Sequence, residues 1–315
     1  MGMRRREFLV RSAVGIGGLM LGTRLAFSAE KPPARYGPFD PVLLGKTKIK
    51  VTRTGLGTGM QGGNRQSNHT RMGKEKFEAL VHAAYERGVR FFDVADLYGT
   101  HPFLAGALKK IPRKDYIISS KIWWMQGGLP EKERPDADVV VRRFLKELDT
   151  DYLDLVLLHC VTSAKWPEQL GKQMETLAKL KKEGVIRAHG VSCHSLQALE
   201  ACVNEPWVDS VHARINPYGL HMDDKPDKVV PVLQNLRKAG KAVVGMKIMC
   251  QGDLRGSDEK RDESVRFVLG LGCVDMMVVG FEKAEEIDDF AARVRKVTVA
   301  GGPTQARVYQ PALMA

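Results

Sequence analysis

The sequence predicts an α/β fold in which eight parallel strands, each followed by a helix, close into a (β/α)8 barrel behind an N-terminal β-hairpin. Short runs rich in apolar and β-branched residues recur at intervals of 24 to 38 residues. Apolar residues at helical spacing lie between most of them, and no change of composition divides the chain in the middle. Two doubly wound halves would show such a break, so the barrel is favoured. The runs end near Leu56, Phe92, Ser120, Leu158, Val191, Ile215, Met246 and Val279.

Residues 1–28 resemble a twin-arginine export signal. Three arginines at positions 4–6 precede Phe8 and Leu9, and a glycine-bearing apolar stretch follows over 13–21. That stretch is too short to span a bilayer, so no stable membrane span is expected in the mature form. Small side chains at Ala26 and Ser28 predict cleavage after Ser28, following export by the twin-arginine translocation machinery to the periplasm. The alternative is a basic helix that stays on the membrane surface.

The next segment leads into the barrel. Residues 29–41 contain four prolines and are expected to form an extended leader. Apolar residues at 43–44 and at 49 and 51 flank a possible turn over 45–48, which predicts a small hairpin at the N-terminal mouth of the barrel. The (β/α)8 TIM barrel is then expected over residues 42–300, and residues 301–315 form a C-terminal tail.

Three of the connecting helices have an especially clear pattern. Apolar residues repeat at helical spacing over 77–84, 140–148 and 174–180. Gly184 follows the last of these and is a typical helix stop. These segments are therefore expected to cover the outside of the barrel.

Composition excludes several classes of function. Lysine and arginine number 49 against 37 acidic residues, a net charge of +12, and removal of residues 1–29, with five arginines and one glutamate, would leave about +8. No basic run is interleaved with aromatic residues, so a nucleic-acid partner is not expected. The 5 cysteines form no CxxC pair, which argues against a metal centre or a disulfide scaffold.

Polar residues stand where six of the predicted strands end. The C-terminal ends of barrel strands are where the βα loops converge and where active sites form. A single histidine or lysine there would be read as a hydrogen-bonded or solvated residue. Three ionisable groups at the ends of three successive strands indicate a site. The six residues are Asp93, Lys121, His159, Ser192, Asn216 and Lys247.

These groups predict a proton-delivery site for a carbonyl oxygen. Tyr98 follows Asp93 by five residues and can turn back over the barrel mouth. An unperturbed tyrosine titrates near 10, so it needs a nearby cation to act efficiently at neutral pH, and Lys121 is placed to be that cation. Asp93 would keep Lys121 charged, and His159 would orient the substrate oxygen. This chemistry requires no metal.

From Val42 to Arg293 the chain resembles the aldo-keto reductase family. Residues 93–99, 120–121 and 157–159 match the segments of that family that carry its catalytic residues, in the same order. The resemblance implies hydride transfer from a nicotinamide cofactor to an aldehyde or ketone, with Tyr98 as general acid. Asp93, Lys121 and His159 would assist it, and the substrate would be a small-molecule carbonyl compound.

The resemblance also implies where the cofactor lies. Cys193 stands where the family has an asparagine, and His212 and Ile215 stand where it has a glutamine and a stacking tyrosine. Residues 246–247 and 251–252 fall at the pyrophosphate loop. Glu282 would repel a 2′-phosphate, but NADPH is favoured over NADH by family frequency. The implied cofactor contacts are Gly57, Thr58, Ser192, Cys193, His212, Ile215, Asn216, Lys247, Gly280, Lys283 and Glu286.

Two alternatives remain open at this point. The sequence Gly57-x-Gly59-x-x-Gly62 satisfies a dinucleotide fingerprint, but polar residues follow it instead of a helix, so a first βα turn is favoured. Trp123 and Trp124 follow the Lys121 strand, and one of them is expected to wall the substrate pocket. The second function considered is a cofactor-binding redox sensor or partner-docking module without significant turnover.

Overall fold

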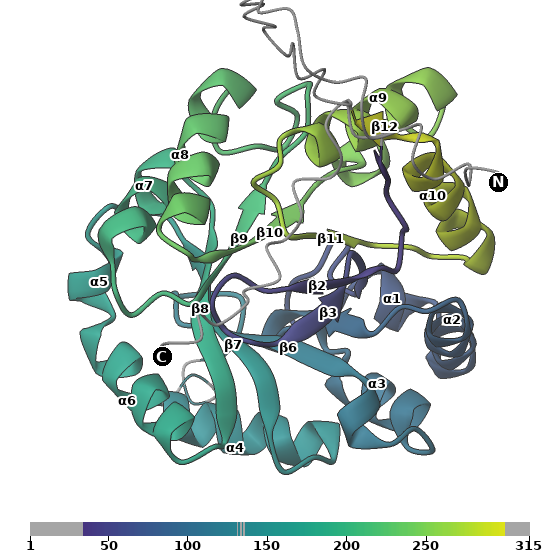
Figure 1. Ribbon diagram of the computed structural model, residues 1–315. Helices are drawn as coiled ribbons and strands as arrows, with labels where there is room; N and C mark the ends of the chain where they lie inside the picture. The colour runs from purple at the N-terminus through teal and green to yellow at the C-terminus, as the bar shows by residue number, and fades with distance from the viewer. Residues whose placement is uncertain (1–33, 131, 133, 135, 300–315) are drawn as a thin grey trace, which may run out of the picture. The chain divides into compact units, whose positions relative to one another are not determined.

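The eight predicted strands are present and close into a barrel. The computed structural model describes residues 34–130, 132, 134 and 136–299 (Figure 1). The barrel strands follow one another in sequence order, every pair is parallel, and β11 pairs with β4 to close the sheet. The predicted TIM barrel is thereby confirmed. Its strands are β4 (Thr54–Gly57), β5 (Phe91–Asp93), β6 (Ile117–Ile122), β7 (Leu153–Val161), β8 (Ile186–Cys193), β9 (Ser210–Arg214), β10 (Ala242–Met246) and β11 (Met276–Val279).

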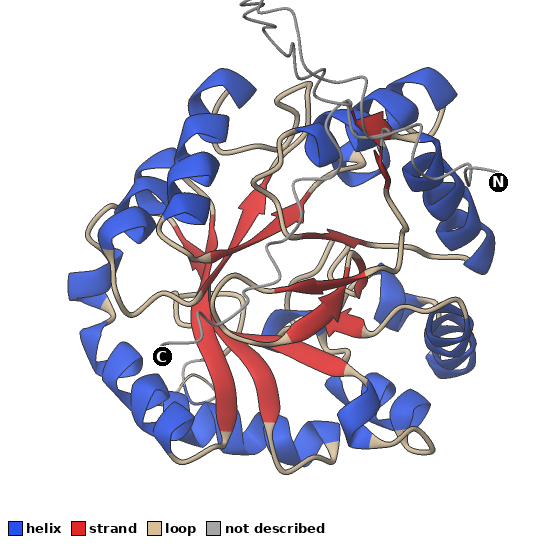
Figure 2. Cartoon of the chain, viewed as in Figure 1, coloured by secondary structure: helices blue, strands red, loops and turns tan. Residues whose placement is uncertain are grey.

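Helices surround the strands on the outside of the barrel, as Figure 2 shows. The three segments predicted from their spacing lie in α2, α4 and α6, and each turns its apolar stripe toward the sheet. Gly184 adopts a φ of 77° just after α6, which favours glycine. The longer helices are α2 (Lys74–Glu86), α3 (His101–Leu108), α4 (Ala137–Leu148), α6 (Gly171–Lys182), α7 (Leu196–Asn204), α8 (Pro226–Lys238), α9 (Asp258–Gly270) and α10 (Ala284–Lys296), and α1 (Asn68–Arg71) and α5 (Trp166–Gln169) are short.

The predicted hairpin closes one end of the barrel. β2 (Pro41–Leu43) pairs antiparallel with β3 (Lys50–Thr52). Its apolar side chains join the interior cluster of the barrel, together with Phe91 of β5 and Ile117 of β6. Since these residues lie at the start of their strands, the hairpin fills the N-terminal mouth and leaves the opposite end to the βα loops.

Two short strands lie beyond the hairpin and the last helix. β1 (Ala34–Arg35) pairs antiparallel with β12 (Thr298–Val299). The predicted leader therefore includes a short strand. The predicted signal peptide, its cleavage site and residues 301–315 lie outside the described residues. Within the described residues, no helix has the length and apolar character needed to cross a membrane.

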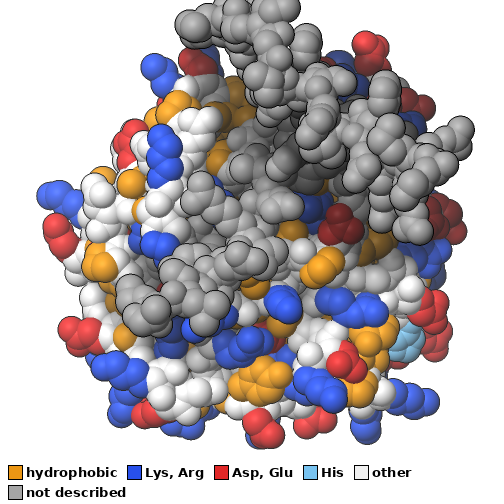
Figure 3. Space-filling model, in the orientation of Figure 1, with side chains coloured by type: hydrophobic (Ala, Val, Ile, Leu, Met, Phe, Trp, Pro, Cys, Tyr) orange, Lys and Arg blue, Asp and Glu red, His pale blue; other side chains and the backbone are white. Residues whose placement is uncertain are grey.

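Charged side chains are mixed on the face shown in Figure 3. Lysine and arginine are interspersed with aspartate and glutamate around the edge of this face. Many of the described ion pairs join neighbouring surface residues, for example Lys172 with Asp136 at 2.8 Å. Such exposed pairs contribute little stability each.

The alternation of side chains along each strand decides which residues reach the barrel interior. On β8, Val191 and Cys193 pack outward in the core shared with the helices, so Ser192 points inward. At β9, Ala213 and Ile215 pack outward in the same core, which leaves His212 and Arg214 to face the interior. The inward or outward alternation of side chains along each strand therefore decides which polar groups lie inside the barrel.

Candidate functional site

Asp93 and Lys121 form an ion pair inside the barrel. Both side chains are buried, and Lys121 is 0% exposed. Lys121 Nζ lies 2.5 Å from Asp93 Oδ2 and donates a second hydrogen bond to the carbonyl of Val94 at 2.9 Å. Burial alone would raise the pKa of Asp93, but Lys121 and His212 outweigh it and lower the pKa to about 2. Asp93 is therefore an anion at neutral pH.

Tyr98 is held above this pair by a tight turn. It ends the 3₁₀-helix η1 (Asp96–Tyr98), and Gly99 follows with a φ of 68°. A Cβ atom on Gly99 would lie 2.0 Å from the Arg65 carbonyl oxygen, and one on Gly59 would lie 2.3 Å from the Tyr98 ring. Both positions require glycine because the Tyr98 loop packs directly against backbone.

The hydroxyl of Tyr98 meets His159 rather than Lys121. Tyr98 Oη lies 3.3 Å from His159 Nε2, whereas Lys121 Nζ lies 4.9 Å from the centre of the tyrosine ring. Burial and the nearby charge of Asp93 raise the pKa of Tyr98 well above its ordinary value. We expected Lys121 to lower that pKa, but its hydrogen bonds go to Asp93 and Val94. Tyr98 is a neutral phenol in this site.

His159 is fixed from several sides. It lies on β7, and Trp124 donates from Nε1 to its carbonyl at 2.7 Å. The ring of Trp123 approaches the His159 ring edge to face at 5.7 Å between centroids. Burial and the charge of Lys121 hold the pKa of His159 well below its ordinary value. His159 is therefore neutral at pH 7, and the two predicted tryptophans both lie beside it.

Asp96 anchors the loop that carries Tyr98. Two guanidinium nitrogens of Arg143 on α4 donate to its buried carboxylate oxygens at 2.6 and 3.0 Å, and a guanidinium nitrogen of Arg65 donates at 3.1 Å. Arginine pairs a carboxylate in two places at once and so fixes its orientation. No sequence pattern predicts this cluster, because Arg65, Asp96 and Arg143 come from distant segments.

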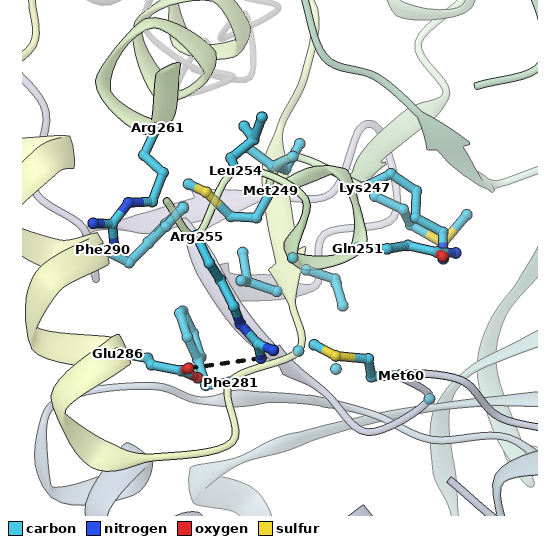
Figure 4. A pocket seen from close by; sticks show the side chains of 18 of the residues that line it. Met60, Lys247, Met249, Gln251, Leu254, Arg255, Arg261, Phe281, Glu286 and Phe290 are labelled. Carbon is cyan, nitrogen blue, oxygen red and sulfur yellow. Dashed lines mark ion pairs between the residues drawn. The ribbon is translucent and has the colours of Figure 1, made fainter. Parts of the chain in front are cut away.

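A cavity of about 420 Å³ runs from Tyr98 and Asp93 to α10. Its walls come from the ends of β4, β10 and β11, the loop after β10, and α10. Figure 4 shows Lys247 and Gln251 on one side and Arg255 extending toward Glu286 on the other. Among the predicted cofactor contacts, those that line it are Gly57, Lys247, Gly280 and Glu286.

Lys247 lines this cavity beside Gln251. Its backbone has a φ of 61°. Within the part of the chain that the structure describes, no carboxylate lies within ion-pair distance of its ammonium group. Burial and the charge of Arg214 lower its pKa. Arg214 itself is paired with Asp223.

Three predicted cofactor residues instead hold the protein around the site, and a fourth, Lys283, lies away from the cavity. Thr58 Oγ1 donates to the Asp93 carbonyl at 2.9 Å. Ser192 Oγ accepts a hydrogen bond from the backbone of Cys160 at 2.9 Å. Asn216 donates to the Leu220 carbonyl at 2.8 Å and so fixes the following turn. Lys283 precedes the first turn of α10 and does not contribute to the cavity wall.

The structure also separates Cys193, Ile215 and His212 from the cavity. The Cys193 thiol is buried in the outer core, 3.7 Å from that of Cys202, and Ile215 lies in the same core because both side chains point outward. Met246 of β10 lines the cavity in place of Ile215. His212 points inward but bonds Asp93 at 3.2 Å from Nε2 to Oδ1, and its side chain is 0% exposed.

Several lining residues were missed by the sequence reading. Arg255 lies 2.6 Å from Glu282 and 3.8 Å from Glu286, and Asn68 holds the other oxygen of Glu282 at 2.6 Å. Arg255 and Arg261 lie in a charged segment before and within α9, and arginines in such segments are mostly solvated. The missed lining residues include Met60, Arg255, Arg261, Asp289 and Phe290.

The chain matches the model of the aldo/keto reductase family over residues 53–300. It is 32% identical over 206 residues to probable aldo-keto reductase 1 of Glycine max, covering 62% of this chain and 56% of that protein. It is 28% identical over 150 residues to methylglyoxal reductase DkgB of Salmonella typhimurium, covering 44% and 52%. The chain thus spans little more than half the length of these curated relatives.

Solved structures share the fold. A putative aldo-keto reductase from Pseudomonas aeruginosa superposes with a TM-score of 0.66 at 23% identity, covering 83% of this chain and 96% of that one. An aldo-keto reductase from Klebsiella pneumoniae, solved in complex with NADPH, superposes with a TM-score of 0.60 at 18% identity, covering 81% and 90%. At these identities the likeness shows the fold alone.

Proposed function

The chain belongs to the aldo/keto reductase family, and from this premise we propose that it is an NADPH-dependent oxidoreductase that reduces an aldehyde or ketone to an alcohol. The observation that carries the proposal is the buried Asp93–Lys121 pair beside Tyr98 and His159. Asp93 and Tyr98 line one end of the cavity. Perturbed ionisable groups gathered at one end of a cavity are typical of a catalytic site.

Tyr98 would be the general acid. Its raised pKa keeps the phenol protonated at neutral pH, so the proton is available when the carbonyl oxygen gains negative charge. After that transfer the tyrosine oxygen would carry the charge, with Lys121 4.9 Å from its ring to stabilise it. Asp93 holds Lys121 in place for this purpose.

His159 and the tryptophans would orient the substrate. Neutral His159 lies 3.3 Å from the Tyr98 hydroxyl, so a carbonyl oxygen bound to one of them is within reach of the other. Trp124 is engaged with the His159 backbone and supports it. Trp123, whose ring faces His159, is the better candidate for the wall of the substrate pocket.

The residues along the cavity fit a nicotinamide dinucleotide, which would supply the hydride. Gly57 and Gly280 keep the wall flat, and a Cβ atom on Gly57 would lie 2.7 Å from Val278. The ammonium group of Lys247 would pair with the pyrophosphate beside Gln251. At the far end Arg255 would pair with a 2′-phosphate, in place of the carboxylates that now bind it.

We also propose that residues 1–28 form a twin-arginine signal peptide and that the mature protein is periplasmic. Arginines at 4–6, the short apolar stretch over 13–21 and the small residues Ala26 and Ser28 support this. The domain boundaries proposed with it are a leader over 29–41, the barrel over 42–300 and a tail over 301–315.

The function is tested with protein that begins at Ala29. We would mix it with NADPH and a reactive aromatic aldehyde and follow oxidation of the cofactor, beside the variant Tyr98→Phe. We expect turnover that falls by about 10² or more in the variant, while NADPH affinity changes by no more than a few fold. Equal rates would reject the role of Tyr98. Tight NADPH binding without turnover on a broad panel of carbonyl compounds would favour the sensing or docking function instead.

A further inference from the structure

We propose that His212 is a positioning residue of the proton-delivery site, which fixes Asp93 beneath Tyr98 through its second carboxylate oxygen, and that it does not contact the cofactor. The inference rests on the proposed reduction and adds a fifth group to it. It also replaces the cofactor role that the sequence suggested for this position.

The two carboxylate oxygens of Asp93 accept hydrogen bonds from residues on two different strands. Lys121 of β6 donates to Oδ2 at 2.5 Å, and His212 of β9 donates to Oδ1 at 3.2 Å. β5, which carries Asp93, and β9 stand on opposite sides of the closed eight-stranded ring. The hydrogen bond from His212 therefore spans the barrel interior and fixes the carboxylate from the side that Lys121 does not reach.

The protonation of His212 follows from its partner. An ionised carboxylate only accepts hydrogen bonds, so Nε2 of His212 is the nitrogen that carries the proton. Burial lowers the pKa of His212, which keeps the ring neutral. Its Nδ1 is buried without a hydrogen-bond partner among the described residues, and the ring packs beside Phe91 at 6.4 Å between centroids. Turning the ring toward the cofactor would leave Asp93 Oδ1 without its donor.

Among the described residues, Lys121, His212, Tyr98 and His159 interact electrostatically with Asp93. Lys121 approaches from β6 and His212 from β9, Tyr98 lies in the loop after β5, and His159 lies on β7. Only Lys121 and His212 donate hydrogen bonds to the carboxylate among the described residues. Loss of His212 would thus leave one buried oxygen unsatisfied, loosen the anchor of Lys121 and raise the pKa of Asp93.

The test compares two substitutions in the protein that begins at Ala29. His212→Leu removes the donor and fills most of the space, whereas His212→Gln keeps an N–H group of similar reach. We expect kcat to fall about ten-fold in His212→Leu and to recover most of that loss in His212→Gln. The KM for the aldehyde and the Kd for NADPH should stay within about three-fold of the wild-type values in both variants. A ten-fold weaker NADPH affinity with unchanged kcat would show a cofactor contact and overturn the inference, as would equal loss of kcat in both variants.

A second measurement needs no turnover. The carboxyl of Asp93 has a pKa below its unfolded value, so its contribution to stability is present above about pH 4 and is lost as the pH falls toward 2. His212→Leu should reduce that contribution more than His212→Gln does, and neither variant titrates at position 212, so the difference in urea-unfolding stability between the two variants should be largest near pH 7 and narrow toward pH 3. A pH-independent difference would reject the contact with Asp93. If wild-type protein shows no turnover, the proposed function fails, and this unfolding comparison still decides the role of His212.

Discussion

Lys121 and Asp93 are joined by an ion pair of 2.5 Å in the interior of the barrel, where the exposed fraction of Lys121 is 0%. Such a pair does not by itself make a fold more stable than apolar residues would, since both charges lose their hydration. Its position at the end of a cavity fits the proton chemistry proposed above.

Breaking the pair from one side should destabilise the fold. Asp93→Asn leaves the Lys121 ammonium buried without its counter-ion, and we expect a loss of about 3 kcal/mol in the free energy of unfolding. Removing both charges in Asp93→Asn/Lys121→Met should cost less than the sum of the two single changes, because no charge remains buried. Urea unfolding at pH 7 measures all four proteins. Strict additivity would show that the two side chains do not interact.

The pH dependence of reduction should be flat across neutral pH. Burial and Asp93 raise the pKa of Tyr98 above 10, so the phenol stays protonated and able to donate through this range. Burial and Lys121 hold the pKa of His159 below 6.5, so His159 stays neutral. We expect kcat/KM to change little between pH 6.5 and 9 and to fall only at higher pH. If kcat/KM instead fell with an apparent pKa below 8, and this fall were absent in Tyr98→Phe, the phenol of Tyr98 would not be protonated throughout this range.

The packing of Tyr98 against Gly59 should be essential. Gly59→Ala places a methyl group 2.3 Å from the tyrosine ring, so the ring must move. A displacement of about 1 Å in a catalytic group can cost about 10² in rate, and we expect a loss of that order in kcat. Gly63→Ala is the matched control, because a Cβ atom there has no neighbour within 4 Å. Similar kcat values for both variants would show that Tyr98 is not held by this contact.

Arg255 should discriminate NADPH from NADH. Its guanidinium group lies at the far end of the cavity between Glu282 and Glu286, where a 2′-phosphate would compete for it. Arg255→Ala should weaken NADPH binding about ten-fold and leave NADH binding nearly unchanged. Arg266→Ala removes the same charge from an exposed position on α9 and serves as the control. Equal effects on the two cofactors would place the 2′-phosphate elsewhere.

Export should depend on the paired arginines. Replacing Arg5 and Arg6 with lysine keeps the charge of the N-terminal segment but removes the residues that the translocation machinery reads. We expect the full-length variant to accumulate inside the cell, in fractionation of cells that export the wild-type chain. The same amount of periplasmic protein from both chains would exclude the twin-arginine route.

The sequence predicted the elements of this fold well because their signals are local. Each barrel strand is a short apolar run, and the ionisable residues at or near the ends of β5, β6 and β7 could be identified in order. Asp93 and Lys121 were expected to meet, and the structure brings them together. This success reflects the rule that the C-terminal ends of parallel strands share one face.

The sequence did not predict the site correctly where an assignment depended on which face of a strand a side chain lies on, or on contacts between distant segments. Cys193 and Ile215 were assigned to the cofactor although strand alternation turns both outward, and a shift of one residue reverses the face. The partners of Asp96, Asp93 and Glu282 include Arg143, His212 and Arg255, each from a remote part of the chain. No pattern within one segment reveals such pairs.

The closure of the barrel has a consequence for how the protein matures. β4 and β11 are the first and last strands of the ring, about 220 residues apart, and their pairing is the contact of longest sequence separation in the barrel. Contacts of this kind demand the largest loop-closure entropy and slow folding. The cavity lies on this seam, with Gly57 from one strand and Val279 from the other. A ligand bound there would contact both strands of this pairing and, because it binds only the folded protein, would stabilise the closed barrel against unfolding.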